Sequence, residues 1–219
     1  MTPGVAVTTR RRQHSLVHSG KDLMRQLSKS LVILSLLSVG VRVGGQTPAA
    51  ASNVARPADQ LVGEGIRAAK GQHRLVLVDV GSSGCGWCHQ FNKFLADTGP
   101  AGRTMRDNFV IVPLVIDETE PAMIARNNPG ADTLIDRFYP KAHEGGIPFY
   151  AILDTTGRVI GTSYELPDGS NIGHPEADIE IESFDRLLAR VAPRITQAQR
   201  EKIKAYLIGM RTRKTGETH

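Results

Sequence analysis

The stretch Leu75–Phe94, LVLVDVGSSGCGWCHQFNKF, organises the rest of this 219-residue chain. Its first six residues, Leu75–Val80, are apolar apart from one aspartate and predict a short buried strand. The glycines and serines of Gly81–Gly84 then break the strand and supply residues that begin helices. Apolar side chains recur at helical spacing further on, so we expect a helix from about Cys85 to Asp97.

The only two cysteines of the chain, Cys85 and Cys88, fall in the first turn of this helix. The first N–H groups of a helix lack intrahelical partners and carry partial positive charge, which favours a thiolate over a thiol. Because the thiolate is the nucleophile, Cys85 is expected to attack, and Cys88 can reach back to it. The alternative is a plain structural disulfide, but a loop this short makes a crosslink worth only about 2 kcal/mol.

The segment Cys85–His89 also reads C-x-x-C-H, the pattern that attaches c-type haem. In that interpretation His89 is one axial ligand and a distal Met or His is the other. The candidates for the distal ligand are Met105, Met123, Met210, His143 and His174, and their sequence surroundings single none of them out. A zinc or copper site made by the cysteines and a distant histidine is a further alternative. We expect no metal ion and no cofactor, with His143 and His174 in loops.

The basic character of the chain, a net charge of +5 at pH 7, is concentrated near the N-terminus. Residues 1–51 hold seven Lys or Arg and one acid, which leaves 20 basic and 21 acidic residues in the rest, a net charge of −1. The body of the protein therefore lacks the excess of basic residues that is typical of nucleic-acid-binding proteins.

An apolar run of 11 residues, Leu31–Val41, is too short for a membrane span, which needs about 20 residues. Arg25 and Lys29 precede the run, and Ala49–Ala51 offers a small-residue cleavage site, so the segment predicts a secretory signal peptide. A leader of ordinary length would begin at Met24, which we expect to be the true start. The mature protein is then exported to a periplasmic or other extracytoplasmic space, without a stable membrane span, where disulfides persist.

The rest of the chain alternates between strand and helix patterns. Helices are expected at Gln60–Lys70, Gly102–Asp107, Asp132–Tyr139, Phe184–Val191 (capped by Ser183) and Gln197–Ile208 (capped by Thr196), and strands at Phe109–Ile116, Phe149–Leu153 and Arg158–Gly161. Pro113 indicates an edge or a bulge in its strand. Residues 164–178 are predicted to form a polar surface segment. The pattern predicts an α/β fold with a central mixed sheet flanked by helices. The domains expected are a leader (1–51), a body (52–193) and a C-terminal helix with a polar tail (194–219).

Four features together resemble the thioredoxin-like family over Asp59–Val191. They are the strand–C-x-x-C–helix unit, Asp79 six residues before Cys85, the strand end Val115-Ile116-Asp117, and Gly146-Ile147-Pro148 followed by the turn Asp154–Gly157. The Gly-Trp pair between the cysteines and the long C-terminal segment resemble the exported thiol–disulfide interchange proteins. The chain departs from thioredoxin at Gly84, where thioredoxin has an aromatic residue, and at Pro113, where it has a lysine.

The resemblance implies roles for residues around the cysteines. Asp79 would be a desolvated acid that takes a proton from Cys88, although a purely structural carboxylate is the alternative. A cis Ile147–Pro148 bond would present a backbone edge to an extended substrate peptide; an ordinary trans proline is the alternative. Trp87 would be a docking surface or simply packed. When protonated, His89 would favour the Cys85 thiolate, or it is a solvated histidine.

The function expected from these features is an exported, monomeric thiol–disulfide oxidoreductase of thioredoxin-like fold. Cys85, Cys88 and Asp79 are its catalytic residues, and Trp87, Ile147 and Pro148 bind substrate. Its partners are proteins with disulfides or thiols, together with a redox partner, and whether it oxidises, reduces or isomerises is left open. The alternatives are a haem c electron carrier and a redox-inert binding module with the same fold.

Overall fold

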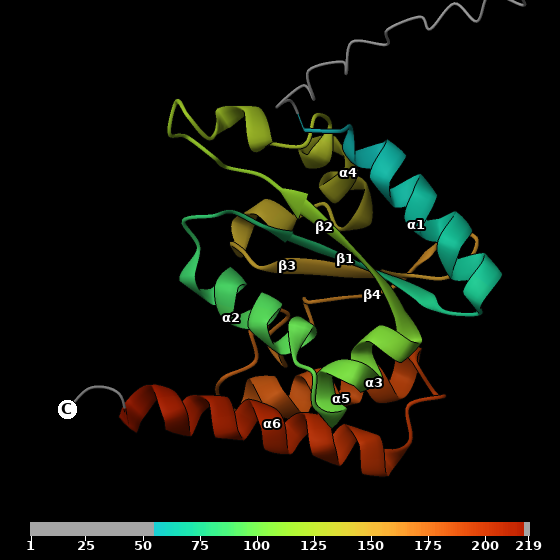
Figure 1. The fold of residues 1–219 in the computed structure, drawn as a ribbon, viewed down its shortest axis with the longest axis vertical. Helices are drawn as coiled ribbons and strands as arrows, with labels where there is room; N and C mark the ends of the chain where they lie inside the picture. Colours follow the sequence, from blue (N-terminus) through green and yellow to red (C-terminus); the bar gives the residue numbers. More distant parts are fainter. Residues whose placement is uncertain (1–54, 217–219) are drawn as a thin grey trace, which may run out of the picture. The chain divides into compact units, whose positions relative to one another are not determined.

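The computed structural model describes residues 55–216 (Figure 1). The leader predicted over residues 1–51, its apolar run and Met24 lie outside the described residues. The strands are β1 (Leu75–Gly81), β2 (Phe109–Val115), β3 (Phe149–Leu153) and β4 (Val159–Thr162). The α-helices are α1 (Ala58–Gln72), α2 (Gly86–Ala96), α3 (Pro100–Asn108), α4 (Ala131–Phe138), α5 (Asp178–Val191) and α6 (Gln197–Gly216), with short 3-10 turns η1 (Ile124–Arg126) and η2 (Ala142–Glu144).

The four strands form one mixed sheet in the order β2-β1-β3-β4. Strands β1 and β2 run parallel, whereas β3 is antiparallel to both β1 and β4. Strand β2 lies at an edge, so the edge position predicted from Pro113 is confirmed. The mixed sheet flanked by helices that the sequence predicted is also confirmed.

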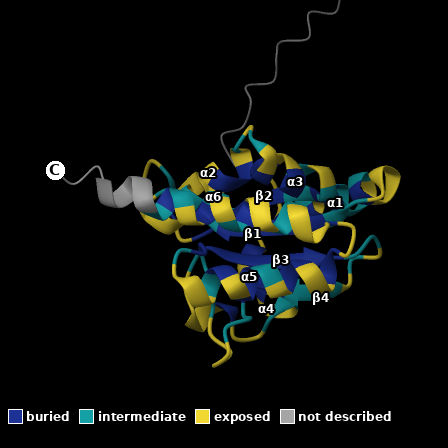
Figure 2. Cartoon of the chain, turned by 90° about the horizontal axis from the view of Figure 1, so that it is seen from below, coloured by how far each residue is buried: buried dark blue, intermediate teal, exposed yellow. Residues whose placement is uncertain are grey.

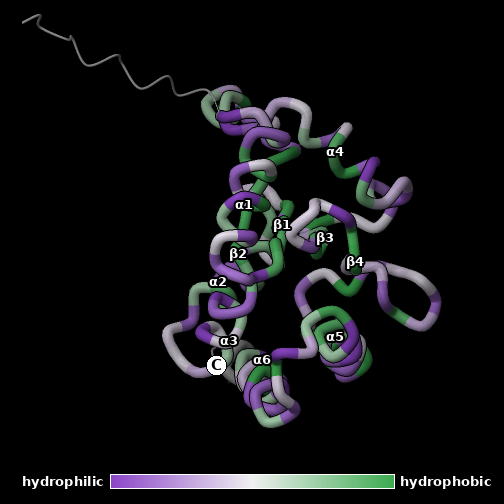
Figure 3. Tube along the Cα trace, turned by 90° about the vertical axis from the view of Figure 1, so that its right-hand side faces the viewer, coloured by the Kyte–Doolittle hydropathy of each residue, from purple (hydrophilic) through white to green (hydrophobic). Residues whose placement is uncertain are grey.

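The two faces of the sheet bury separate hydrophobic clusters. Val76, Val78 and Val80 of β1 face α1 and α4, while Leu77 belongs to the cluster that contains residues of α2, α3, α5 and α6. Figure 2 shows β1 and β3 as a buried layer between the helices, and Figure 3 shows that hydrophobic positions follow the same strands. Since side chains alternate along a strand, Asp79 and Gly81 share the face of Leu77 and lie under α2.

Helix α5 begins at Asp178, six residues before the predicted start at Phe184. Ser183, predicted to cap the helix, is instead buried inside it. The cap is made by the Glu180 carboxylate, which accepts hydrogen bonds from the N–H groups of Glu176 (2.9 Å) and Ala177 (2.8 Å). The prediction missed this start because the acceptor lies within the helix rather than before it.

Helix α6 begins at Gln197 as predicted, and the Thr196 hydroxyl accepts a hydrogen bond from the Gln199 N–H (3.3 Å). It extends to Gly216, beyond the predicted end at Ile208. Ile203, Leu207 and Met210 of α6 belong to the same buried cluster as α5. None of the helices in residues 55–216 has the length and hydrophobicity that a membrane-spanning helix requires.

Candidate active site

Cys85 and Cys88 form a disulfide at the start of α2, just after the end of β1. Cys85 is the N-cap residue of α2, and its Sγ accepts a hydrogen bond from the Cys88 N–H at 3.0 Å. Cys88 is buried with 2% of its surface exposed, whereas Cys85 is only half-buried. A nucleophile from solvent or from another protein therefore meets Cys85 first, and an N–H donor already points at that sulfur.

The loop before β3 lies against this disulfide. Its Ile147–Pro148 peptide bond is cis. The Ile147 carbonyl oxygen lies 3.7 Å from Cys85 Sγ, while Ile147 is half-buried and Pro148 is buried. The structure thus places Ile147 next to the sulfur atom of a residue 62 positions earlier in the sequence.

Asp79 lies beneath α2 with 5% of its surface exposed. Its neighbour on the same face of β1 is Gly81, where an added Cβ would be 2.9 Å from Cys88 Sγ. Residues two apart on one strand face are about 6.6 Å apart, so Asp79 lies one strand repeat away from the Cys88 contact. Burial raises the pKa of Asp79 from 3.8 to about 7. The side chain lines a cavity of about 160 Å³ that also includes Pro113 and His89.

The loop Ser82–Gly84 before Cys85 is held from two sides. Glu118, with 7% of its surface exposed, accepts hydrogen bonds from the Ser83 N–H and the Ser83 hydroxyl, both at 2.7 Å. These bonds lower the pKa of the Glu118 carboxyl below its usual value. His89 places its Nε2 2.7 Å from the Ser83 carbonyl oxygen. Glu118 was not predicted from the sequence, because its partner Ser83 lies 35 residues away.

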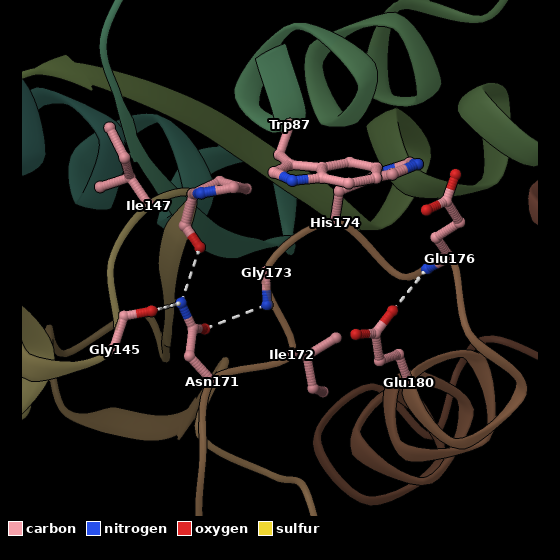
Figure 4. Close-up of a pocket in the computed structure, with 10 residues that line it drawn as sticks. Trp87, Gly145, Ile147, Asn171, Ile172, Gly173, His174, Glu176 and Glu180 are labelled. Atoms are coloured by element: carbon pink, nitrogen blue, oxygen red, sulfur yellow. Dashed lines mark hydrogen bonds between the residues drawn. The ribbon is translucent and has the colours of Figure 1, made fainter. Parts of the chain in front are cut away.

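Trp87 packs against a residue from the segment before α5. Its ring stacks on the ring of His174, with centroids 6.1 Å apart and planes 22° apart (Figure 4). His174 also meets Phe91 edge-on, with centroids 6.4 Å apart. Trp87 is 43% exposed, whereas His174 is 7% exposed. The prediction that residues 164–178 are a polar surface segment is therefore wrong in part, because Ile172 and His174 are buried there.

Asn171, from the same segment, bonds to the cis-proline loop. Its Nδ2 lies 3.2, 3.0 and 3.1 Å from the carbonyl oxygens of Gly145, Gly146 and Pro148. Its Oδ1 accepts a hydrogen bond from the Gly173 N–H at 3.1 Å. A groove of about 250 Å³ lies between this loop and Trp87 (Figure 4). Its lining includes both residues of the cis bond together with Asn171 and His174.

The comparisons with known proteins agree with this geometry. A family model described as thioredoxin-like matches residues 59–155. The chain contains a thioredoxin-like domain. Such a domain with a Cys-x-x-Cys disulfide at a helix start is suited to thiol–disulfide redox chemistry.

Two solved structures are similar to the chain at low identity. One is a disulphide isomerase from Xylella fastidiosa Temecula1, at 17% identity and a TM-score of 0.42, covering 60% of this chain and 89% of that one. The other is a DsbH oxidoreductase, at 14% identity and a TM-score of 0.38, covering 68% of this chain and 94% of that one. Both scores lie below 0.5, so the fold assignment depends on the family match and the topology. No curated protein matches the chain.

Part of the site lies outside the range of the family match. The thioredoxin-like model ends at residue 155, whereas Asn171 and His174 follow the β3–β4 hairpin. A single asparagine or histidine in a loop carries no sequence signal for a distant contact. Asn171 was consequently missed, and His174 was named only as a candidate haem ligand and a loop residue, not as a partner of Trp87.

The haem interpretation fits this domain poorly. A disulfide uses both sulfur atoms that haem attachment requires. Of the distal-ligand candidates, Met105 and Met210 are buried in the hydrophobic cluster, and His143 is bonded to Asp136 at 3.1 Å. Across residues 55–216, no group of three or more His, Cys, Asp or Glu side chains is placed to hold a metal ion.

Proposed function

We propose that this protein is a thiol–disulfide oxidoreductase that uses Cys85 and Cys88 to reduce or exchange disulfides in exported proteins. One observation carries the proposal. A half-buried Cys85 sulfur at the start of α2 accepts an N–H hydrogen bond, and a buried Cys88 lies directly behind it. This arrangement separates an attacking sulfur from a resolving one.

The reaction starts from the dithiol form of the protein. The Cys85 thiolate attacks one sulfur of a substrate disulfide, which forms a mixed disulfide and releases the other substrate sulfur as a thiolate that takes up a proton. Cys88 then loses its proton and attacks Cys85 Sγ. The Cys85–Cys88 disulfide forms, the second substrate thiol leaves, and two electrons have passed to the substrate. A dithiol of a redox partner then supplies two electrons that reduce the Cys85–Cys88 disulfide, and the partner is itself oxidised to a disulfide.

Asp79 is the proposed proton acceptor for Cys88. It is buried under α2, on the strand face where Gly81 contacts Cys88. Its pKa of about 7 means that it exchanges protons readily near neutral pH, where a general base is most useful. The cavity that it lines gives the proton a polar surrounding that includes His89 and Glu118.

Trp87, Ile147 and Pro148 are the proposed substrate-binding residues. They line one groove beside the disulfide, and Trp87 exposes 43% of its surface there. An extended peptide can lie along such a groove and offer its cysteine to Cys85.

The cellular setting is proposed from the sequence. The leader over residues 1–51 directs export, the body over residues 52–193 carries the activity, and residues 194–219 add a C-terminal helix. The protein acts as a monomer without a bound cofactor or nucleic acid.

The proposal is tested by insulin reduction with dithiothreitol as the electron source. Cys85→Ser is expected to lower the catalysed rate at least about a hundredfold, because it removes the nucleophile. Cys88→Ser is expected to accumulate mixed disulfides with substrate, visible on non-reducing gels. If Cys85→Ser kept the wild-type rate, the assignment of the nucleophile would be wrong. A redox titration of the pair then distinguishes a reductant from an oxidant.

A further inference from the structure

We propose that Asn171 and His174 are specificity-determining residues, which build one wall of the groove beside Cys85 so that it selects cysteines within an extended polypeptide. This inference rests on the proposed thiol–disulfide activity and adds to it two residues that set its preference for a peptide substrate. The two residues come from the segment between β4 and α5, outside the range of the family match.

Asn171 connects this segment to the cis-proline loop. Its side-chain amide nitrogen lies within 3.2 Å of three backbone acceptors, the carbonyl oxygens of Gly145, Gly146 and Pro148. Gly145 has no room for a side chain here, because an added Cβ would clash with the Tyr164 ring and would lie 3.0 Å from Asn171 Cβ. Gly173 adopts a positive φ of 59° and lies against Pro148. The loop beside Cys85 is therefore fixed by a side chain that the segment supplies.

His174 connects the same segment to the cysteine helix. Three residues after Asn171, its buried ring stacks on Trp87, the only tryptophan of the chain. The stacking sets the orientation of the indole, which stands between the two cysteines in sequence and remains 43% exposed. One four-residue stretch, Asn171–His174, thus fixes both sides of the groove (Figure 4).

The size and lining of the groove point to the substrate class. A volume of about 250 Å³ is below the range of about 300–1,000 Å³ for sites that enclose a whole small molecule. It suits one or two side chains of a peptide that continues beyond the groove at either end. Ile147, Pro148 and Ile172 supply apolar contacts, and Glu176 and Glu180 also line the groove. A small disulfide needs only access to Cys85 Sγ and gains nothing from this wall.

The test compares two substrates with the same leaving group. One is a blocked cysteine and the other an extended peptide with a central cysteine, each joined through a disulfide to 5-thio-2-nitrobenzoate. The reduced protein is mixed with each in a single turnover, and the coloured thiol is recorded as it leaves. The ratio of the two second-order rate constants, peptide over blocked cysteine, measures how much the groove favours reaction with the peptide.

Asn171→Ala and His174→Ala are each expected to lower this ratio by about tenfold, the effect of losing a few packing and hydrogen-bonding contacts to the peptide. Asn108→Ala is the matched control. It also removes a side-chain hydrogen bond to backbone, from Asn108 Nδ2 to the Thr104 carbonyl, but at the end of the sheet away from the disulfide. Its ratio should equal that of the wild type. An unchanged ratio in both Asn171→Ala and His174→Ala would overturn the inference.

His174→Phe gives a second measure that does not depend on a cavity-forming change. It keeps a planar ring against Trp87, so its ratio should stay within about threefold of the wild type. A ratio as low as that of His174→Ala would contradict the role given to the ring. Trp87 fluorescence, titrated with the same peptide carrying serine for cysteine, should show binding that weakens in Asn171→Ala and His174→Ala. Failure of the proposed function looks different, because wild type and Cys85→Ser would then react alike with both substrates.

Discussion

Asp79 is the residue whose chemistry depends most on burial. Its pKa is about 7 in the folded protein against 3.8 for an ordinary aspartate. The folded state therefore binds more protons than the unfolded state between these two values, and stability falls as the pH rises through that window. Below about pH 3.8 the carboxyl is neutral in both states and does not lower the free energy of unfolding. Above about pH 7 it is charged in both states, and burying the charge lowers the free energy of unfolding by the full amount.

Asp79→Asn is expected to stabilise the oxidised protein, and the gain should grow by roughly 2–3 kcal/mol between pH 5 and pH 8. The reason is that asparagine fills the same space without a charge to bury. Urea unfolding of both proteins at the two pH values measures the difference. The oxidised form is used because its cysteines do not titrate. A gain of equal size at both pH values would mean that the carboxyl is not the titrating group.

At this scale the sequence pattern predicted the residues that depend on local spacing. Ile147 and Pro148, which reach the site by a tertiary contact, came only from the family resemblance, and the groove residues of the segment before α5 were missed. Cys85, Cys88 and Asp79 lie on one strand–helix unit, so a pattern of ten residues placed them. His174 and Asn171 are ordinary loop residues until the chain folds back on itself. The roles of all five remain predictions that the kinetic tests address.

The junction of β1 and α2 is the element that limits what the active site can tolerate. Helix α2 approaches the end of β1 so closely that a Cβ on Gly81 would lie 2.9 Å from Cys88 Sγ and 3.0 Å from Cys88 Cβ. The sulfur is held in a disulfide and cannot turn away. Gly81→Ala is therefore expected to destabilise the oxidised protein by about 1–3 kcal/mol, as overpacking does.

Gly84→Ala is the matched control for this change. Gly84 lies three residues further along the chain, in the loop after β1, and no atom lies within 4 Å of the Cβ that the substitution would add. Its effect on the free energy of unfolding should stay within about 0.5 kcal/mol. Urea unfolding of the two variants decides the matter, since equal effects would show that the Cys88 contact does not limit this position.

Among the elements, the sequence predicted which segments are helices or strands better than where they start. Strand β3 has its predicted limits, Phe149–Leu153, because an unbroken apolar run fixes them. Helix α5 starts earlier than predicted because Asp178 and Glu180 look like surface residues in the sequence. In the structure the Glu180 carboxylate accepts hydrogen bonds from the N–H groups of Glu176 and Ala177, just before the helix. Helix α6 extends beyond its predicted end at Ile208. Met210 continues the apolar spacing of Ile203 and Leu207 by one position, and the polar sequence after it gives no periodic signal.

The whole molecule depends on two helices that lie beyond the range of the family match. Residues of α5 and α6 complete the hydrophobic cluster on the face of the sheet that also holds α2. Phe94 of α2 packs against Phe184 of α5, with ring centroids 6.0 Å apart, and against Tyr206 of α6, at 5.9 Å. The helix that carries the cysteines is thus supported by the C-terminal part of the chain.

This support predicts that Leu207→Ala destabilises the protein by about 2–5 kcal/mol, because Leu207 is 1% exposed and its loss leaves a cavity in the cluster. Ile179→Ala, at a position 49% exposed on α5, is the control and should cost under about 1 kcal/mol. Urea unfolding gives both values. If Leu207→Ala cost no more than Ile179→Ala, α6 would be peripheral to the fold. The reduced Leu207→Ala protein, assayed where it remains folded, should release thionitrobenzoate from the blocked cysteine substrate at close to the wild-type rate. The reason is that Tyr206 of α6 contacts Phe94 near the C-terminal end of α2, whereas the cysteines lie at its start.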